Sequence, residues 1–348
     1  MVKSKILGAI KRLNLNLQGK VVLTEAATGP YSVTAIIAAL AGAKVFAYTK
    51  ETKYGSVNQV RRELKGLVDQ FGDNRLDINI IDELTPQIIF RADIITNSGH
   101  LRPLNEDLLS HAKPGVVIPL MYETWELRPD DVDVKFCSRN SISLAGTNER
   151  HSDVGIFDYL PEMVIKLIHD SGLSLLNNKF ILICNNDFGA YISRGISGLC
   201  EKLAVCDLKG NKSKYDLTAI DWIGDFPKMK IPNDYRDCAG IIWATFPLLE
   251  EWIGTSNEPF QVKDIISAID SPLILRVVGQ MNETRLNEFI HLFPRHVDSG
   301  HMGVLPSAIG HDPIIRLQAA GLKVGELQLE GEQYFNEQIL AEYFQTIS

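Results

Sequence analysis

Histidine has the side-chain pKa nearest neutrality, so the histidines are the first candidates for proton transfer. His100 closes the polar segment Asn97-Ser98-Gly99-His100, which follows an apolar run at 94–96. His301 lies in Ser299-Gly300-His301-Met302-Gly303, where the glycines would let a ligand approach closely. We expect His301 or His100 to act as an acid or base. The alternative for His100 is a solvent-exposed loop histidine without a catalytic role.

Three histidines, His296, His301 and His311, lie in one segment rich in glycine and proline. This composition predicts a long irregular loop, and long loops in compact domains are often functional. Asp298 and Asp312 add carboxylates to the segment, but the spacing matches no compact zinc signature. We therefore predict no metal site.

A second kind of chemistry is indicated by the segment 121–128, MYETWELR, which follows an apolar run at 116–120. Arg128 could hold a substrate carboxylate through two parallel hydrogen bonds. Glu123, in the same segment, is a further candidate catalytic residue. The alternative is a surface loop whose charges form ordinary ion pairs.

These candidates sit in a chain whose composition is that of a globular protein. The 348 residues favour two domains, and 45% hydrophobic with 22% charged residues is ordinary. The net charge of −8 argues against a nucleic-acid partner. The five cysteines form no CxxC pair, which favours reduced thiols in a cytoplasmic protein. No apolar run reaches the length of a membrane span, so we expect no membrane partner and read the basic N-terminal segment as a helix packed on the protein.

The pattern of strands and helices occurs twice along the chain. The first half has predicted strands at 20–24, 44–48, 76–81, 94–96 and 116–120, with helices at 31–41 and 57–71. After a long helical pattern at 153–171, strands are predicted at 180–184, 202–206, 240–244 and 273–277, with a helix at 190–199. Such alternation predicts two Rossmann-like, doubly wound parallel-sheet domains of the α/β class, joined by a long helix. We place them at 1–150 and 151–331, with a C-terminal helix at 332–348 packing back on the first.

The turn at 184–189, CNNDFG, lies where a Rossmann domain binds the pyrophosphate of a dinucleotide. Of the three glycine positions of that loop, only Gly189 carries a glycine. Asp207 follows the next strand, where an acid accepts hydrogen bonds from a ribose and favours NAD over NADP. The predicted cofactor contacts are Asn185, Asp187, Phe188, Gly189, Asp207 and Thr245. The alternative is a domain that has lost its dinucleotide, with Asp187 capping the helix.

The corresponding turn in the first half, at 24–31, is a weaker dinucleotide site because it has one glycine and no acid after the next strand. It suits a substrate domain better. Glu25, Thr28 and Tyr31 would line the carboxyl end of the first sheet, where ligands of α/β proteins bind.

Two successive Rossmann-like domains joined by a helix resemble the formate/glycerate dehydrogenase type, which includes D-2-hydroxyacid dehydrogenases, alanine dehydrogenases and adenosylhomocysteine hydrolases. The segment 35–45, AIIAALAGAKV, is similar to the first domain of the hydrolases, and 147–150, TNER, resembles the entry to the dehydrogenases' linker helix. The resemblance implies a substrate-binding first domain and an NAD-binding second domain. The dehydrogenases' Arg-Gly pair has only a partial counterpart here, because Arg276 is followed by Val277. No Glu between Arg276 and His301 matches the family's spacing.

The leading hypothesis is therefore an NAD- or NADP-dependent oxidoreductase that acts on a small, carboxylate-bearing metabolite in the interdomain cleft. The cofactor would perform the hydride chemistry, and the protein would supply orientation and one proton-transfer group. The alternative is a non-redox enzyme or a ligand-binding protein on the same scaffold, with tightly bound NAD or none. We expect a cytoplasmic homodimer.

Overall fold

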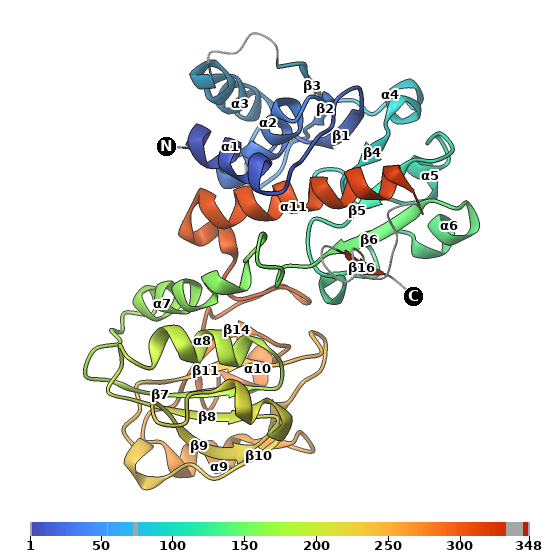
Figure 1. The fold of residues 1–348 in the computed structure, drawn as a ribbon. Coiled ribbons are helices and arrows are strands. Elements are labelled where there is room, and N and C mark those ends of the chain that lie inside the picture. The colour runs from blue at the N-terminus through green and yellow to red at the C-terminus, as the bar shows by residue number, and fades with distance from the viewer. Residues whose placement is uncertain (1, 54, 72–75, 332–343, 347–348) are drawn as a thin grey trace. The chain divides into compact units, whose positions relative to one another are not determined.

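The computed structural model describes residues 2–53, 55–71, 76–331 and 344–346. The chain divides into two compact units. Unit 1 comprises Met1–Ile156 and Gly310–Ser348, and unit 2 comprises Phe157–Ile309. Each unit is built on its own seven-stranded sheet, as the repeated strand–helix pattern predicts (Figure 1).

The sheet of unit 1 has the order β16-β6-β5-β4-β1-β2-β3. Its strands are β1 (Val21–Glu25), β2 (Lys44–Tyr48), β3 (Ile78–Ile81), β4 (Ile94–Ile95), β5 (Val117–Pro119), β6 (Ser143–Thr147) and β16 (Phe344–Thr346). Strands β1 to β6 pair in parallel, and β16 pairs antiparallel with β6. The central strands are apolar and buried because helices cover both faces of a parallel sheet.

The helices of unit 1 are α1 (Val2–Arg12), α2 (Val33–Leu40), α3 (Val57–Phe71), α4 (Pro86–Arg91), α5 (Glu106–Leu109), α6 (Val134–Arg139) and α11 (His311–Glu330), with 3₁₀ turns η1 (Gly29–Ser32) and η2 (Thr124–Glu126). Local signals set several of their ends. Thr85 caps α4 by accepting a hydrogen bond from Ile88 N, and Pro86 occupies the first turn. Asn105 caps α5 in the same way through Leu108 N.

Helix α11 packs along α1, α2, β5 and β6 of unit 1 (Figure 1). Two glycines allow the close approach. A Cβ at Gly325 would lie 3.1 Å from Ile94 and Pro119, and one at Gly321 would lie 2.6 Å from Met121 Sδ. Several polar residues on its buried face are paired. Gln318 accepts a hydrogen bond from Thr34, and Lys323 forms an ion pair with Glu326.

The sheet of unit 2 has the order β10-β9-β8-β7-β11-β14-β15. Its strands are β7 (Lys179–Cys184), β8 (Lys202–Asp207), β9 (Asp221–Asp225), β10 (Lys228–Met229), β11 (Gly240–Ala244), β14 (Leu273–Val278) and β15 (His291–Phe293), and β12 (Ile253–Gly254) pairs separately with β13 (Phe260–Gln261). Its helices are α7 (Leu160–Asp170), α8 (Phe188–Ile196), α9 (Val262–Ala268) and α10 (Glu283–Leu286), with 3₁₀ turns η3 (Phe157–Tyr159), η4 (Lys209–Lys214), η5 (Asn233–Tyr235) and η6 (Pro306–Ile309).

The same strand order occurs in both units. Taking the parallel strands of each unit as 1 to 6 in chain order, both sheets run 3-2-1-4-5-6, with one antiparallel strand at an edge. This is the order of the doubly wound Rossmann fold, in which the direction of winding reverses between strands 1 and 4. The predicted fold class is thereby confirmed. The reversal lies between β1 and β4 in unit 1, and between β7 and β11 in unit 2.

Three predicted boundaries need correction. The helical pattern predicted at 153–171 forms only η3 and α7, since Pro161 belongs in the first turn of a helix and α7 begins at Leu160. The second unit ends at Ile309, and not at 331, because α11 buries its surface in unit 1. The helix predicted at 332–348 lies mostly outside the described residues, and its described part, Phe344–Thr346, forms β16.

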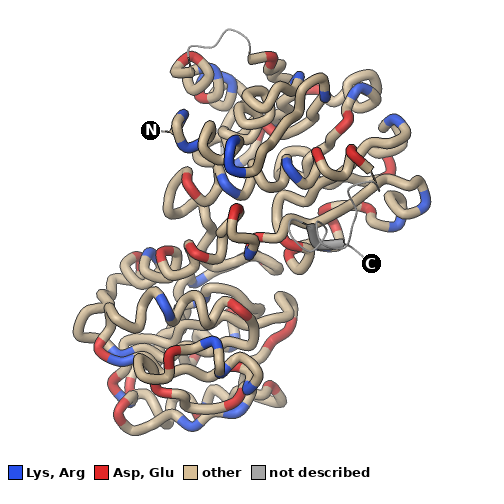
Figure 2. Tube along the Cα trace, viewed as in Figure 1, with Lys and Arg blue, Asp and Glu red and all other residues tan. Residues whose placement is uncertain are grey.

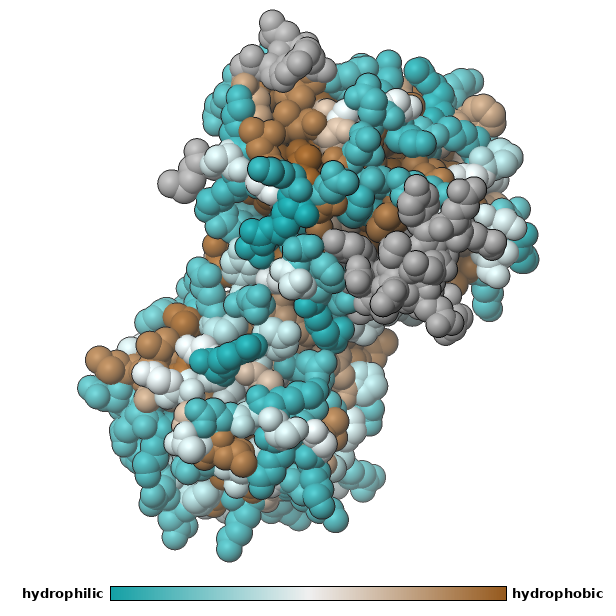
Figure 3. Space-filling model, viewed as in Figure 1, coloured by the Kyte–Doolittle hydropathy of each residue, from teal (hydrophilic) through white to brown (hydrophobic). Residues whose placement is uncertain are grey.

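The surface mixes charges of both signs. Lys and Arg are interspersed with Asp and Glu along the described residues of both units (Figure 2). The face shown in Figure 3 is mostly hydrophilic, with apolar residues in small patches. Among the described residues, no helix has the length and apolar character needed to cross a membrane. The cytoplasmic location and the homodimer stay predictions.

Candidate functional site

In unit 1, polar side chains gather where the winding of the sheet reverses. Strands β1 and β4 end side by side, and Thr24 Oγ1 at the end of β1 accepts a hydrogen bond from Thr96 Oγ1 at 2.8 Å. Thr96 Oγ1 also lies 2.8 Å from Ser98 Oγ. The crevice beyond such strand ends is where doubly wound folds bind ligands. The predicted segment Asn97–His100 therefore lies in the ligand-binding position of this fold.

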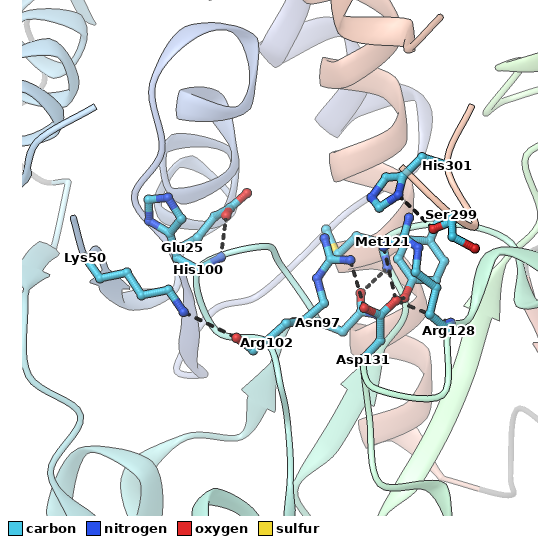
Figure 4. A network of polar contacts seen from close by, with 11 residues as sticks. Glu25, Lys50, Asn97, His100, Arg102, Met121, Arg128, Asp131, Ser299 and His301 are labelled. Carbon is cyan, nitrogen blue, oxygen red and sulfur yellow. Dashed lines mark hydrogen bonds and ion pairs between the residues drawn. The ribbon is translucent and has the colours of Figure 1, made fainter. Parts of the chain in front are cut away.

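Glu25 and His100 meet across this crevice. Glu25 Oε2 accepts a hydrogen bond from His100 N at 3.1 Å, although the Glu25 side chain is almost fully buried. Gly99 lies beside the same oxygen, since a Cβ there would be 3.4 Å from Glu25 Oε2 and 3.7 Å from an Arg102 side-chain nitrogen. Glu25, His100 and Arg102 thus form one group at the end of β1 and β4 (Figure 4).

Three buried polar atoms at this edge have no hydrogen-bond partner. In the described part of the chain, five buried side-chain nitrogen or oxygen atoms lack a partner, and three of them are Thr49 Oγ1, His100 Nδ1 and Arg102 Nε. Thr49 follows β2, the strand next to β1, and Lys50 Nζ donates to Arg102 O at 3.3 Å. A buried polar atom without a partner costs free energy, and three such atoms lie on the segments that follow β2 and β4, the two neighbours of β1.

A hydrogen-bonded network holds Arg102 in place. Its guanidinium donates to Asp131 Oδ1 at 3.2 Å, and Asp131 Oδ2 accepts from the Tyr122 hydroxyl at 2.5 Å. Asn97 Nδ2 donates to the Tyr122 oxygen at 2.6 Å, and Asn97 Oδ1 accepts from Met121 N at 3.0 Å. Figure 4 shows this network around Asp131. The network fixes the guanidinium, while Arg102 Nε makes no hydrogen bond within the described residues.

The charges in the network stabilise one another. Burial alone would raise the pKa of Asp131, but the Tyr122 hydroxyl and Arg102 hold it below its ordinary value. Burial and the neighbouring Asp131 raise the pKa of Tyr122, so its hydroxyl stays protonated. The site therefore presents a permanent guanidinium cation backed by a carboxylate anion.

Glu123 belongs to a different cluster in unit 1. It is fully buried, its Oε1 accepts from Arg150 at 2.8 Å and from Glu149 N at 3.1 Å, and its Oε2 accepts from Trp125 Nε1 at 2.6 Å. Two further carboxyl groups lie nearby. Burial, together with the charge of Glu123, raises the pKa of Glu126 to about 7 and that of Glu149 well above its ordinary value. Glu126 and Glu149 share a hydrogen bond, as two carboxyl groups do when one is protonated.

The charge of Arg128 acts on this acidic cluster, since it opposes the rise of the Glu126 pKa. Its guanidinium lies 3.6 Å from Asp131 Oδ2, so it shares that carboxylate with Arg102. The predicted role of Arg128 in holding a substrate carboxylate stays a prediction, as does the predicted role of Glu123.

In unit 2, the corresponding crevice is crossed by hydrogen bonds of the chain itself. Asn185, after β7, donates to Phe246 O at 2.6 Å and accepts from Phe246 N at 2.7 Å. Asn186 Nδ2 donates to Ala244 O at 2.9 Å, and Asn186 Oδ1 accepts from Phe188 N at 2.9 Å. The side chain of Asn186, and not that of Asp187, therefore caps α8. The predicted capping by Asp187 is wrong, because Asp187 occupies the N-cap position but its side chain makes no capping hydrogen bond; its Oδ1 forms an ion pair with Lys214 at 2.6 Å.

The remaining predicted cofactor contacts are buried within unit 2. Phe188 is buried, and its ring lies edge-on to Phe157 and Phe246. Thr245 is fully buried, and its Oγ1 accepts from Trp243 Nε1 at 2.8 Å. Gly189 leaves no room for a side chain, since a Cβ would lie 2.1 Å from the Tyr215 hydroxyl.

Asp207 lies at the end of β8, as predicted, and is fully buried. Its Oδ2 accepts from the Tyr215 hydroxyl at 2.5 Å, its Oδ1 accepts from Leu208 N at 2.6 Å, and Asn211 Nδ2 lies within 3.3 Å of both oxygens. Burial raises the pKa of Asp207, although these hydrogen bonds oppose the rise. Tyr215 and Asn211 belong to no recognisable sequence motif.

Unit 2 also contains a histidine oriented by a carboxylate. Arg276 is buried in β14, with Nε donating to Gly279 O at 3.0 Å and a guanidinium nitrogen donating to Glu283 Oε1 at 2.7 Å. Glu283 Oε2 lies 2.8 Å from His296 Nδ1. In the structure, Glu283 therefore links Arg276 to His296. Sequence spacing alone does not reveal this link.

His301 lies outside this chain of contacts. Its Nδ1 is 3.2 Å from Ser299 O, within the irregular segment that precedes η6. Glu283 and Asp298 raise the pKa of the exposed His296, and no corresponding carboxylate contact is found for the His301 ring within the described residues. Among those residues, no cluster of three metal-ligating side chains is found either.

The fold and these sites define a two-unit Rossmann-type α/β protein. No known protein-family profile and no curated protein sequence matches the chain. Among solved structures, it is similar to a dipicolinate synthase subunit from Bacillus halodurans, with a TM-score of 0.54 and 12% identity over 90% of this chain and 98% of that one. The chain shares the fold of that protein.

Two further solved structures align over most of their length. NAD-dependent formate dehydrogenase from Staphylococcus aureus, in complex with NAD, has a TM-score of 0.48 and 11% identity over 94% of this chain and 99% of that one. D-Lactate dehydrogenase with NAD⁺ from Lactobacillus jensenii has a TM-score of 0.42 and 11% identity over 94% and 100%.

Proposed function

We propose that the protein is an NAD-dependent oxidoreductase that acts on a small, carboxylate-bearing metabolite. The observation that carries the proposal is the set of unpartnered buried atoms Thr49 Oγ1, His100 Nδ1 and Arg102 Nε on the segments that follow β2 and β4 of unit 1. A guanidinium with a free Nε suits a carboxylate, which accepts two hydrogen bonds from one arginine. A 2-hydroxy or 2-oxo acid would bring a second polar oxygen for His100 or Thr49.

The cofactor part of the proposal depends on unit 2. Its strand order is that of dinucleotide-binding domains, α8 follows the first strand directly, and Asp207 lies where an acid meets a ribose. Asp207 suits that role chemically, because its Oδ2 already accepts a hydroxyl hydrogen bond. NAD, when bound, supplies the hydride chemistry.

Within unit 2, His296 is the proposed proton-transfer group. Glu283 orients its imidazole through Nδ1, and Arg276 fixes Glu283 from the other side. A histidine oriented by a carboxylate is the usual form of an acid–base catalyst. His301 and His100 remain the candidates predicted from the sequence, and substitution separates the three.

A second function is favoured by one specific observation. Asn185 and Asn186 tie the β7–α8 loop to the end of β11, and Asn186 Oδ1 takes the Phe188 N–H that a phosphate would bind. If this closure is permanent, the protein binds a carboxylate metabolite in unit 1 without a dinucleotide. It would then be a non-redox enzyme or a ligand-binding protein.

A reductase assay separates the two functions. The full chain is mixed with NADH and a panel of 2-oxo acids, and oxidation of NADH is followed together with direct binding of each acid by calorimetry. Turnover that is lost in Arg102→Gln and kept in Arg139→Gln supports the oxidoreductase; Arg139 is an exposed arginine on α6. Binding of an acid without turnover, with or without NADH, supports the second function. Absence of both would contradict the carboxylate site.

A further inference from the structure

The residue of interest is Tyr215, which follows η4 in unit 2 and contacts the acid at the end of β8. Asp207 has no exposed surface, and each of its oxygens already accepts hydrogen bonds from the chain. The Tyr215 side chain is itself buried, and its ring lies edge-on to Trp222 at 5.6 Å between centroids. The Tyr215 hydroxyl is therefore held in one place by packing as well as by Asp207.

The Tyr215 hydroxyl lies directly against Gly189 in the first turn of α8. The oxygen lies 2.1 Å from the point where a Gly189 Cβ would be, so it fills the space between α8 and Asp207. In dinucleotide-binding domains, a ribose hydroxyl donates to the acid at the end of the second strand, beside the glycine-rich turn. The Tyr215 hydroxyl makes the corresponding hydrogen bond to Asp207 at 2.5 Å.

Asn211 is a second side chain that donates hydrogen bonds to Asp207. Its amide donates to both Asp207 oxygens at 3.2 and 3.3 Å and to Asn186 O at 3.4 Å. Asn211 thus bridges the acid and the β7–α8 loop, the two parts that a ribose and its phosphate would join. The segment 207–215 supplies a hydroxyl and an amide in place of the ribose hydroxyls.

We propose that the Tyr215 hydroxyl occupies the ribose position of unit 2 and competes with a dinucleotide for Asp207. This inference rests on the proposed function, because it concerns how the same unit takes up NAD. Tyr215, assisted by Asn211, then sets the affinity of the unit for the cofactor. Binding requires both side chains to leave Asp207.

The test compares dinucleotide binding by the full chain and its variants. Calorimetric titration with NADH is suitable, since it does not depend on the fluorescence of Trp222 beside Tyr215. Tyr215→Phe removes the hydroxyl and keeps the ring, and we expect NADH to bind roughly tenfold more tightly, the usual effect of one hydrogen bond to a charged group. Tyr235→Phe is the matched control, because the buried Tyr235 donates to Asp221 at 2.8 Å at the start of β9.

A double substitution tests whether the effect passes through Asp207. In an Asp207→Asn background, Tyr215→Phe should change NADH affinity by less than about twofold, because the contested carboxylate is gone. A full tenfold gain in that background would overturn the role assigned to Asp207. Melting temperatures of all variants show whether each one is folded.

The outcomes separate this inference from the proposed function. Tighter binding by Tyr215→Phe and unchanged binding by Tyr235→Phe support it. Equal NADH affinities of the wild type and Tyr215→Phe would overturn the competition and leave the oxidoreductase standing. If the wild type, Tyr215→Phe and Tyr215→Ala all fail to bind NADH and NADPH, both the competition and the dinucleotide-dependent function are wrong.

Discussion

The hydroxyl of Tyr122 donates to Asp131 Oδ2 at 2.5 Å, and this contact couples the two ends of the polar network in unit 1. On one side, Tyr122 receives a hydrogen bond from Asn97 in the loop after β4. On the other, Asp131 pairs with Arg102, whose Nε points to no protein partner. The position of the candidate anion-binding group therefore depends on a single buried carboxylate.

Replacing that carboxylate should destabilise unit 1. Asp131→Asn removes the anion that Arg102, Arg128 and Tyr122 all contact, and we expect a loss of about 3 kcal/mol, as when one partner of a buried ion pair is removed. Urea unfolding measures the change. Asp130→Asn, at the exposed neighbouring position, should change the stability by less than about 0.5 kcal/mol. Equal effects of the two substitutions would contradict the network.

Ligand binding should depend on Arg102 specifically. Arg102→Gln removes a charged donor with a free Nε, so affinity for a small 2-oxo acid should fall roughly ten- to a hundredfold. Calorimetry of the acid against the full chain measures this directly. If Arg128→Gln weakens binding and Arg102→Gln does not, the sequence-based choice of Arg128 is correct and the present assignment is not.

The acidic cluster of unit 1 predicts a pH-dependent stability. Burial raises the pKa of Glu126 to about 7, above its ordinary value near 4.5, so the folded chain holds a proton that the unfolded chain has lost in this range. The stability that the protonated Glu126 contributes is therefore fully present below pH 4.5 and is lost as pH rises through about 7. Glu126→Gln should reduce the loss between pH 5 and pH 8 by on the order of 2 kcal/mol.

Denaturant titrations at the two pH values test this prediction for the wild type and Glu126→Gln. Glu83→Gln is a suitable control, since Glu83 is exposed in the turn between β3 and α4. An identical pH dependence of the wild type and Glu126→Gln would show that Glu126 ionises normally.

The contact of Glu283 with His296 can be measured without any substrate. Glu283 raises the pKa of His296, so Glu283→Gln should lower that pKa toward its ordinary value. A pH titration of the imidazole by NMR gives the value. Asp298→Asn should lower it less, because the Asp298 contact is longer, at 3.2 Å against 2.8 Å. A His296 pKa that does not respond to Glu283→Gln would rule out the orienting contact.

The packing of α11 on the sheet gives a stability test. A Cβ at Gly325 would press on Ile94 and Pro119 at 3.1 Å, so Gly325→Ala should cost about 1–3 kcal/mol. Gly8 lies on α1 with nothing within 4 Å, and Gly8→Ala should instead stabilise its helix by up to about 1 kcal/mol. Thermal unfolding of both variants measures these changes in stability. If Gly325→Ala leaves the stability unchanged, α11 packs less closely on Ile94 and Pro119 than the structure shows.

Much of the fold could be predicted from the sequence because buried parallel strands read as apolar runs. The predicted ranges 44–48, 57–71 and 240–244 coincide with β2, α3 and β11. Helix α11 was missed because Gln318, Lys323 and Glu326 lie on its buried face, where they pair with polar partners. A sequence pattern marks such residues as exposed, so their long-range partners are not predictable from it.

The sites were predictable only where a residue directly follows a strand. Asn97–His100 and Asp207 are predicted in this way, since they lie at or just after strand ends, which carry ligand contacts in α/β folds. Arg102, Asp131 and Tyr215 were not found, because each reaches its partner across a loop. The family's spacing singles out no Glu between Arg276 and His301, whereas the structure joins Glu283 to His296.

The most direct test of the dinucleotide claim is calorimetric titration of the full chain and of Asp207→Ala with NADH and NADPH. The oxidoreductase account predicts saturable binding by the wild type, with NADH bound more tightly than NADPH because Asp207 would repel a 2′-phosphate. Asp207→Ala should lose affinity for NADH more than for NADPH. Absence of saturable binding by the wild type and by the Tyr215 variants would contradict the account and leave unit 2 as a Rossmann fold closed by its own side chains.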